Sequence, residues 1–403
     1  MSSDETIGII ELGNSNLKCL IFKIDRNNNS EILSANVTPS DGIHNDVVMN
    51  LKKASDSVRL SISEAEKKAK VSLKKINVIL EQPDFLCTRF SKHKKIDNSK
   101  IHRNDIEFLL KESKRQLILN DKNQSIIHIF NHNYLVDGKI FIEEPINVFA
   151  DSLTHEMSFI TAPKNNLKNI NQIFLDCDIE IERLISQTFA LGVEMFDEEE
   201  LKSGVVLINL GVKKISLGLF KNLALVHSIT FPVGIDHISN DISKVCSLNF
   251  AESLALRDNI NFLFEDKQDS FDENDFLKKN FFVSTKFRKI SKDLILNVIK
   301  ARSDEIFEMF KNQLKVNGFN FNSGINIFLT GEGSNLKNVE KYCQEFFGLN
   351  SAVKKKEKLE KIFPACFGGI RIIKDGWETE AIPEVKDKGI EKIGFLRKLF
   401  GNH

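Results

Sequence analysis

Three glycine turns, each directly after a short apolar run, are the features of this sequence that could hold phosphate groups. They lie at Gly13, Gly211 and Gly331. Glycine allows a backbone to approach a phosphate closely, and a nearby lysine supplies the opposite charge. The second turn reads Gly211-Val212-Lys213-Lys214, with a valine and two lysines where further glycine would be expected. The pattern predicts a phosphate site whose second turn has changed its chemistry.

The elements that position these turns follow from the spacing of apolar residues. Residues 7–24 and 205–220 each predict a strand, a tight turn and a second strand. Residues 325–348 predict a buried strand, a glycine turn and a helix. The other main predictions are helices over 46–70, 94–117 and 234–264, and a strand-like piece from 277 that leads into a long helix ending at Gly318.

The composition limits the classes of function. The chain of 403 residues has 56 basic and 56 acidic residues, so no net charge attracts nucleic acid, and we expect no nucleic-acid partner. No apolar run reaches the roughly 18 residues of a membrane span, and the N-terminus lacks the pattern of a signal peptide. We expect a protein of the cytoplasm, with reduced cysteines and with structural rather than metal-binding roles for His128, His132 and His155.

The three turns, in this order, resemble the phosphate-1, phosphate-2 and adenosine elements of the actin-like ATPase fold. ELGNSNLKCLI at 11–21 resembles the first phosphate element of FtsA, the bacterial cell-division actin. The segments DHISNDIS, FAESLALRDN, INIFLTGEGSNLKNV and FPACFGGI resemble later parts of that family in order. The segment 83–162, with YLVDG and EPINVFADSLTHEMSFITA, is similar to the inserted FtsA subdomain 1C.

The resemblance implies a fold class and a domain division. The fold would be α/β and actin-like (ribonuclease H-like), with two lobes and with the α+β subdomain 1C in place of actin subdomain 1B. The implied division is subdomain 1A at 1–82, 163–200 and 331–374, subdomain 1C at 83–162, subdomain 2A at 201–233 and 301–330, subdomain 2B at 234–300, a linker at 375–388 and a terminal helix at 389–403.

The resemblance also implies which residues would hold ATP. They are Glu11, Gly13, Asn14, Ser15, Asn16, Asn209, Gly211, Lys213, Lys214, Glu252, Gly331, Gly333 and Ser334, with Glu11 as a weak Mg²⁺ contact through water. Asn209 stands where the family has a Mg²⁺-binding aspartate, so the charge that this hard cation selects is lost. The other departures are Val212, Lys213, Lys214, Ala255 and Glu332.

Two interpretations of this site remain open. Lys213 and Lys214 could neutralise phosphates directly, so that ATP binds with little dependence on Mg²⁺. Alternatively, the site has lost its nucleotide and the hairpins remain as structure. Under either interpretation we expect ATP hydrolysis to be weak or absent, because hydrolysis needs the charge of a metal ion and a positioned water molecule.

The last fifteen residues, GIEKIGFLRKLFGNH, have the pattern of an interfacial helix. At ~100° per residue, the apolar side chains fall within an arc of about 160°, flanked by basic residues. The predicted membrane contacts are Ile390, Lys392, Ile393, Phe395, Leu396, Arg397, Lys398, Leu399 and Phe400. The FtsA membrane helix occupies the same position. A helix docked on its own protein, or on a partner, is the alternative.

The resemblance implies partners as well as lipid. In FtsA, subdomain 2B binds the C-terminal tail of FtsZ, and Arg288, Lys289 and Lys292 are the candidate contacts here, with a solvated helix face as the alternative. Self-association through subdomain 1C and contacts with other divisome proteins are expected, on the cytoplasmic side of the bacterial plasma membrane at the septum. Alternative classes are a pilus-assembly homologue similar to PilM and a degenerate sugar-kinase-like phosphotransferase.

Overall fold

The computed structural model describes most of the chain. The described residues are 5–25, 28–141, 144–264, 268–319, 326–348, 353–355 and 362–375. The predicted terminal helix at 389–403, and all but the first residue of the linker at 375–388, lie outside them. The described residues divide into two compact units: those within 1–204, 218–229 and 358–403 form unit 1, and those within 205–217 and 230–357 form unit 2.

A five-stranded sheet forms the core of unit 1, in the order β11-β6-β1-β2-β3. Its strands are β1 (Glu5–Glu11), β2 (Asn16–Ile24), β3 (Ser30–Pro39), β6 (Lys75–Leu80) and β11 (Glu180–Ser186). β1 and β2 pair antiparallel through the predicted turn, and β1 pairs parallel with β6. Most Ile, Leu, Val and Phe side chains of β1, β2 and β6 are buried, as expected for strands covered on both faces, whereas Ile32 and Val37 of the edge strand β3 are exposed.

Helices cover both faces of this sheet. α1 (Leu51–Ala69) and α3 (Lys164–Leu175) contact each other, and α1 packs on β2 and β3. α4 (Gln187–Met195) and α10 (Pro364–Asp375) also pack together, against β6 and β1 respectively. The smaller elements are β4 (Ile43–His44), β5 (Val47–Val48) and α5 (Glu198–Ser203). The helix predicted from residue 46 begins at Leu51, after Asn50 caps it by accepting a hydrogen bond from the Lys53 amide.

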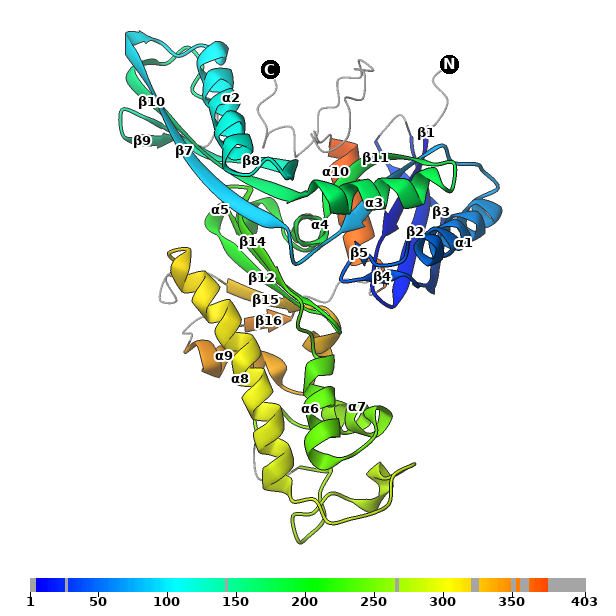
Figure 1. Cartoon of the computed structure of the whole chain (residues 1–403). Helices are drawn as coiled ribbons and strands as arrows, with labels where there is room; N and C mark the ends of the chain where they lie inside the picture. The colour runs from blue at the N-terminus through cyan, green and yellow to red at the C-terminus, as the bar shows by residue number, and fades with distance from the viewer. Residues whose placement is uncertain are drawn as a thin grey trace. The chain divides into compact units, whose positions relative to one another are not determined.

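Between β6 and α3 the chain forms an inserted module in which one helix packs against an antiparallel sheet (Figure 1). Its elements are β7 (Leu86–Lys100), α2 (Arg103–Asn120), β8 (Gln124–Val136), β9 (Lys139–Phe141) and β10 (Phe149–Pro163). The sheet is antiparallel in the order β7-β10-β8-β9, and α2 packs on β7 and β10.

The predicted start of the helix in this module was wrong. A helix was predicted over 94–117, but residues 94–100 belong to β7, where Lys94 pairs with Leu153 of β10. Ile96 is buried between exposed neighbours, which is the alternation of a strand. The helix begins at Arg103, and Asp105 accepts a hydrogen bond from the His102 amide at 2.7 Å. Pairing with a strand distant in the sequence overrode the local helical signal.

The second large sheet has the order β14-β13-β12-β15-β16. Its strands are β12 (Val205–Leu210), β13 (Ile215–Lys221), β14 (Ala224–Phe231), β15 (Asn326–Thr330) and β16 (Val353–Lys355). The helices of unit 2 are α6 (Asp236–Cys246), α7 (Phe250–Asn259), α8 (Lys292–Val316) and α9 (Val339–Phe347), with short 3₁₀ turns η1 (Lys279–Phe281) and η2 (Glu332–Asn335).

Two predictions for unit 2 need correction. The helix predicted over 234–264 is divided into α6 and α7, because Ser247 takes a left-handed conformation (φ 47°) and ends α6. The strand-like piece predicted from residue 277 is a loop with one 3₁₀ turn, η1, held by side chains described below. None of the helices in the described residues is both long and apolar enough to span a bilayer.

Candidate functional site

The first phosphate turn lies in unit 1, where a lysine neutralises its acidic residue. Glu11 ends β1, and Lys18 stands opposite it on β2. The Lys18 ammonium is 3.3 Å from both carboxylate oxygens, and the Gln187 side-chain amide donates to Glu11 at 2.7 Å. Glu11 is 5% exposed. The carboxylate predicted as a weak Mg²⁺ contact is therefore already paired with a cation of the chain itself.

The turn itself is fixed by a neighbouring turn. Asn14 donates to the Asn45 side chain at 3.0 Å, and the Asn45 amide donates back to the Asn14 side chain. A Cβ on Gly13 would lie 2.6 Å from the Asn16 carbonyl oxygen, so the tight bend requires glycine. Ser15 and Asn16 are exposed.

A buried acidic network beside this turn was missed by sequence reasoning. Asp46 accepts a hydrogen bond from the Glu81 amide at 2.7 Å. Glu81 in turn accepts from the Ser186 hydroxyl at 2.7 Å and from the Thr188 amide at 2.9 Å, at the N-terminus of α4. A carboxylate is favoured there by the orphan amides and dipole of the helix. The network aligns α4, and hence Gln187, with Glu11.

The second phosphate turn lies in unit 2 and is attached to the start of α6. The amides of Ile235 and Asp236 donate to the carbonyls of Gly211 and Val212, both at 3.0 Å. A Cβ on Gly234 would lie 2.2 Å from the Val212 carbonyl oxygen, so the two backbones are in close contact. Two amides that open this helix thus bind the turn of the chain itself.

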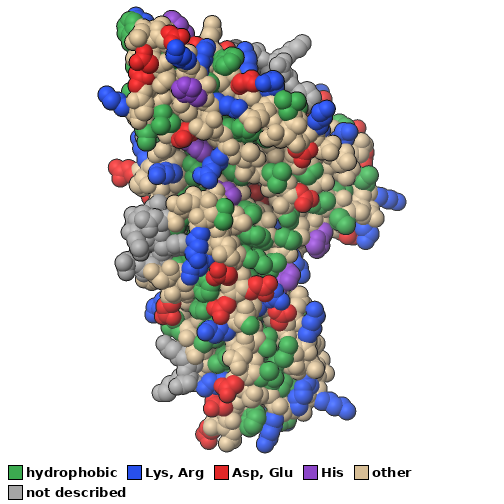
Figure 2. Space-filling model, turned by 60° about the vertical axis from the view of Figure 1, so that its left-hand side comes forward, with side chains coloured by type: hydrophobic (Ala, Val, Ile, Leu, Met, Phe, Trp, Pro, Cys, Tyr) green, Lys and Arg blue, Asp and Glu red, His purple; other side chains and the backbone are tan. Residues whose placement is uncertain are grey.

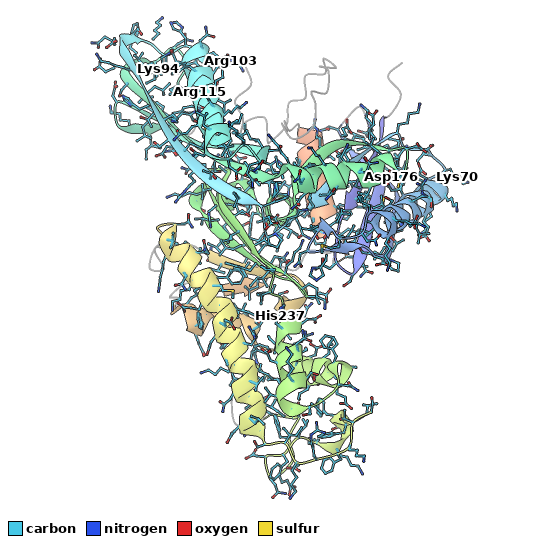
Figure 3. All side chains as sticks on the ribbon, viewed as in Figure 1. Lys70, Lys94, Arg103, Arg115, Asp176 and His237 are labelled. Atoms are coloured by element: carbon cyan, nitrogen blue, oxygen red, sulfur yellow. The ribbon has the colours of Figure 1, made fainter. Side chains whose placement is uncertain are left out.

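Lys213 is ion-paired within unit 2. Its ammonium lies 2.9 Å from Asp236, which also pairs with Arg257 at 3.3 Å, and Arg257 pairs with Asp258 at 2.8 Å. Asp236 and Arg257 are buried, and the Lys213 ammonium is 5.9 Å from the Phe250 ring centre. His237, labelled in Figure 3, follows Asp236 at the start of α6. Two cations and two anions balance, so the network carries no net charge.

Asp236 and Arg257 were also missed, although both lie in segments that carried the family resemblance. Asp236 opens DHISNDIS and Arg257 lies in FAESLALRDN. An acidic first residue of a helix is favoured by the helix dipole alone, so no signal in the sequence indicated the two cations that Asp236 binds.

The adenosine turn packs tightly against β12. Gly331 has φ +82°, and a Cβ on it would lie 2.4 Å from the Asn209 side-chain oxygen. A Cβ on Gly333 would lie 2.7 Å from side-chain carbons of Leu210 and Ile235. The Ser334 hydroxyl donates to the Gly331 carbonyl at 2.7 Å. The predicted site residues Asn209, Gly331, Gly333 and Ser334 thus lie together with Gly211 in unit 2. Gly331 and Gly333 have no room for a side chain, which explains why glycine stands at both positions.

Glu252, implied by the resemblance for the ribose, instead holds a loop. Its carboxylate accepts from the amides of Asn249 at 3.0 Å, Val283 and Ser284 at 2.8 Å and Thr285 at 2.9 Å, and from the Thr285 hydroxyl at 2.8 Å. Burial alone would raise the pKa of this carboxyl, but the bonds from Thr285, Ser284 and Asn249 outweigh it and lower the pKa to about 2. An open cavity of about 430 Å³ lies beside it, lined among others by Ala255.

The three basic residues predicted to contact a partner have different surroundings. Arg288 donates to the carbonyls of Cys246 and Ser247 at the end of α6. Lys292 is 9% exposed and pairs with Asp275 at 3.1 Å. Lys289 is exposed, with its ammonium 5.2 Å from the centre of the Phe276 ring.

These contacts test whether the residues fit a complex of Mg²⁺ and nucleotide. Glu11 is paired with Lys18, Lys213 is paired with Asp236, and Glu252 already accepts five hydrogen bonds. Within the described residues, no group of three or more His, Cys, Asp or Glu side chains could hold a metal ion. The residues therefore do not fit the Mg²⁺ site of the type that the resemblance implies, and we derive no hydrolytic step.

Comparisons with known proteins show similarity to the family that the sequence resembles. A family model described as "SHS2 domain inserted in FTSA" matches residues 86–161, the inserted module. Cell division protein FtsA of Pseudomonas aeruginosa is 22% identical over 86% of this chain and 82% of its own length. FtsA of Borreliella burgdorferi is 23% identical over 86% of this chain and 83% of its own length.

Solved structures of other proteins share the fold. A chain of the PilM-PilN type IV pilus biogenesis complex covers 91% of this chain and 98% of its own, with a TM-score of 0.58 and 12% identity. EutJ from Carboxydothermus hydrogenoformans has a TM-score of 0.50 at 10% identity, over 91% of this chain and 90% of its own. The predicted fold class is confirmed: the chain is an actin-like α/β protein with an inserted α+β subdomain.

Proposed function

We propose, from the premise that this chain is a divergent member of the FtsA family of actin-like cell-division proteins, that it attaches FtsZ filaments to the membrane. It would act at the cytoplasmic face of the bacterial plasma membrane, at the division septum, by binding and assembly. The observation that carries this proposal is the inserted module between β6 and α3 of an actin-like unit. The PilM likeness concerns the fold alone and supports no second function.

The membrane contact is proposed from the sequence of the last fifteen residues. Their apolar arc and basic flanks suit a helix that lies in the lipid interface, where each basic residue contributes about 1 kcal/mol near anionic lipid. One short helix binds weakly, so several tails on one polymer would be needed for stable attachment. We propose that the inserted module supplies this self-association, and its exposed Phe108, Leu119 and Phe149 are candidate contacts.

The FtsZ tail is proposed to bind the connection between α7 and α8. Val283 is 84% exposed there, and Phe287 and Leu294 are also exposed, beside the cations Lys286 and Lys289. Figure 2 shows hydrophobic side chains interspersed with basic and acidic ones on the protein surface. Apolar and basic groups together suit an extended peptide that carries apolar and acidic residues. The same premise makes other divisome proteins its partners.

Sedimentation with lipid vesicles tests the membrane contact. The full-length protein and a variant that ends at Gly389 are mixed with vesicles containing phosphatidylglycerol and, separately, with vesicles of phosphatidylcholine alone. We expect the full-length protein to pellet with the anionic vesicles and the shortened variant to stay in solution. Leu399→Glu should release the protein and Asn402→Asp should not, because only the former places a charge in the apolar arc. Equal pelleting of the full-length and shortened proteins would remove the proposal.

A further inference from the structure

We propose that this chain keeps its phosphate and ribose elements folded with its own side chains, Lys18 and Lys213 supplying the cations in place of a complex of Mg²⁺ and nucleotide. Its assembly would then not be controlled by nucleotide. This inference goes beyond the proposed function, because a membrane tether could work with or without a nucleotide switch. It rests on the contacts within each unit taken separately.

In unit 1 the cation is positioned by strand register. Lys18 and Glu11 are direct partners in the β1–β2 pairing, so their side chains share one face of the hairpin. The Glu11 carboxylate is nearly inaccessible and its second neighbour is Gln187, at the start of α4. A metal ion would have to displace an ammonium that is 3.3 Å from both oxygens, and would leave that ammonium partly buried without its partner.

In unit 2 the cation belongs to the phosphate turn itself. Lys213 reaches from the turn to Asp236, while the backbone amide of Asp236 donates to the Val212 carbonyl. The turn is therefore held to α6 twice, once by the backbone and once by an ion pair. Because Asp236 also pairs with Arg257 of α7, the turn and both helices form one neutral network whose two central members, Asp236 and Arg257, are buried. A phosphate group would have to compete with a buried carboxylate for Lys213.

Glu252, the residue that the resemblance assigns to the ribose, likewise binds groups of the chain itself. Five donors already surround the Glu252 carboxylate, and three of them are consecutive backbone amides, those of Val283, Ser284 and Thr285. A ribose hydroxyl would have to displace one of these charge-assisted hydrogen bonds, which are the stronger kind. The first phosphate turn, the second phosphate turn and the ribose residue thus each have an internal partner that keeps them ordered.

Thermal unfolding of the full-length protein tests nucleotide binding directly. Melting is followed in buffer, in about 5 mM ATP with excess Mg²⁺, and in the same ATP with EDTA, since a ligand of the native state raises the melting temperature by mass action. We expect shifts below about 1 °C in both nucleotide conditions. A rise of several degrees with ATP and Mg²⁺ would overturn the proposal, and a rise with ATP in EDTA alone would show that the lysines bind phosphate instead.

Substitution of the lysine tests whether the ion pair holds the turn. Lys213→Met keeps the aliphatic stem of the side chain. It should lower the melting temperature by about 2–4 °C, because the buried Asp236 carboxylate loses one of its two cations. Lys244→Met removes an exposed lysine from the same helix region and should change it by less than about 1 °C. The double variant Lys213→Met/Asp236→Asn should lose less than the sum of the two single variants. Additive losses, or equal effects of the two lysine substitutions, would contradict the proposal.

The outcome is independent of the tether. Pelleting with anionic vesicles is compared with and without ATP and Mg²⁺, and we expect the same pelleted fraction in both. If the protein does not pellet at all, the proposed function fails while the melting experiments still decide the present inference. If ATP changes the pelleted fraction severalfold, control by nucleotide is restored and the inference fails while the tether stands.

Discussion

Glu252 offers the sharpest test of the structure, because one carboxylate holds a whole loop. The substitution Glu252→Gln removes the charge but keeps the side-chain volume. Four backbone amides and one hydroxyl donate to the carboxylate at 2.8–3.0 Å. Hydrogen bonds to a charged group contribute about 1.5–3 kcal/mol each when considered singly. The loop can reach water when it is released, since Val283 is 84% exposed, so the net loss is far smaller than the sum.

The lowered pKa of Glu252 gives a second way to obtain the free energy of unfolding that Glu252→Gln would remove. The folded pKa of about 2 lies below the unbound value of 4.5, so the carboxylate stabilises the folded state above pH 4.5. That stability is lost as the pH falls from 4.5 toward 2. A shift of this size corresponds to about 3 kcal/mol at full weight, which we discount to about 1–2 kcal/mol because the donating loop is open to solvent. We expect Glu252→Gln to lower the free energy of unfolding by this amount at pH 7.

The assay is urea unfolding of both proteins at a series of pH values. The other carboxylates are common to both proteins, so the difference between the two curves isolates Glu252. This difference should be constant from pH 7 to pH 5 and should shrink below pH 4.5. Hydrogen exchange should accelerate in the variant at the amides of Val283, Ser284 and Thr285. Glu332→Gln, at an exposed glutamate of the adenosine turn, is the control. A difference that persists unchanged at pH 3 would refute the reasoning.

Two further predictions concern the inserted module and the adenosine turn. Burial lowers the pKa of His128 and His155 to about 3 and that of His132 to about 4, so below pH 6.5 the unfolded module takes up protons that the folded module does not. The protection factors for hydrogen exchange in β8 and β10, which are corrected for the intrinsic exchange rate at each pH, should therefore fall from pH 7 to pH 5, and constant protection factors would contradict this. Gly331→Ala should lower the free energy of unfolding by about 2–3 kcal/mol, because φ is +82° and the new Cβ would meet Asn209 and the Leu210 carbonyl. Gly318→Ala, at φ +74° with no atom within 4 Å of the new Cβ, should lose only about 1 kcal/mol in the same chemical denaturation, and equal losses would show that the contact is unimportant.

The fold was predictable where the signal was local. The hairpins of β1–β2 and β12–β13 follow from two apolar runs on either side of a glycine turn, and the structure confirms both. The strand β7 was not found, because its polar residues 94–100 alternate weakly and acquire their conformation from pairing with β10.

The turns of the candidate site were predictable from the sequence, whereas the partners of their charged side chains were not. Lys213 was identified as the unusual residue of its turn, but its partner Asp236 is brought to it by the close contact of Gly234 with the turn. Glu252 was identified from a motif, yet four of its five hydrogen bonds come from residues 283–285, more than thirty residues away in the sequence. Residue type and spacing show that a charge is present, whereas the partner that neutralises it is decided by tertiary packing.

Tertiary packing also determines how much positive charge the proposed partner surface offers to a peptide. Arg288 donates hydrogen bonds to the last carbonyls of α6, and the buried Lys292 pairs with Asp275. These two cations contribute to the fold of unit 2, so little of their charge is left for a peptide. Lys286 and Lys289 reach solvent, as do Val283 and Phe287. Affinity on this surface would then come mainly from apolar burial, with these two lysines steering and orienting an acidic segment rather than holding it.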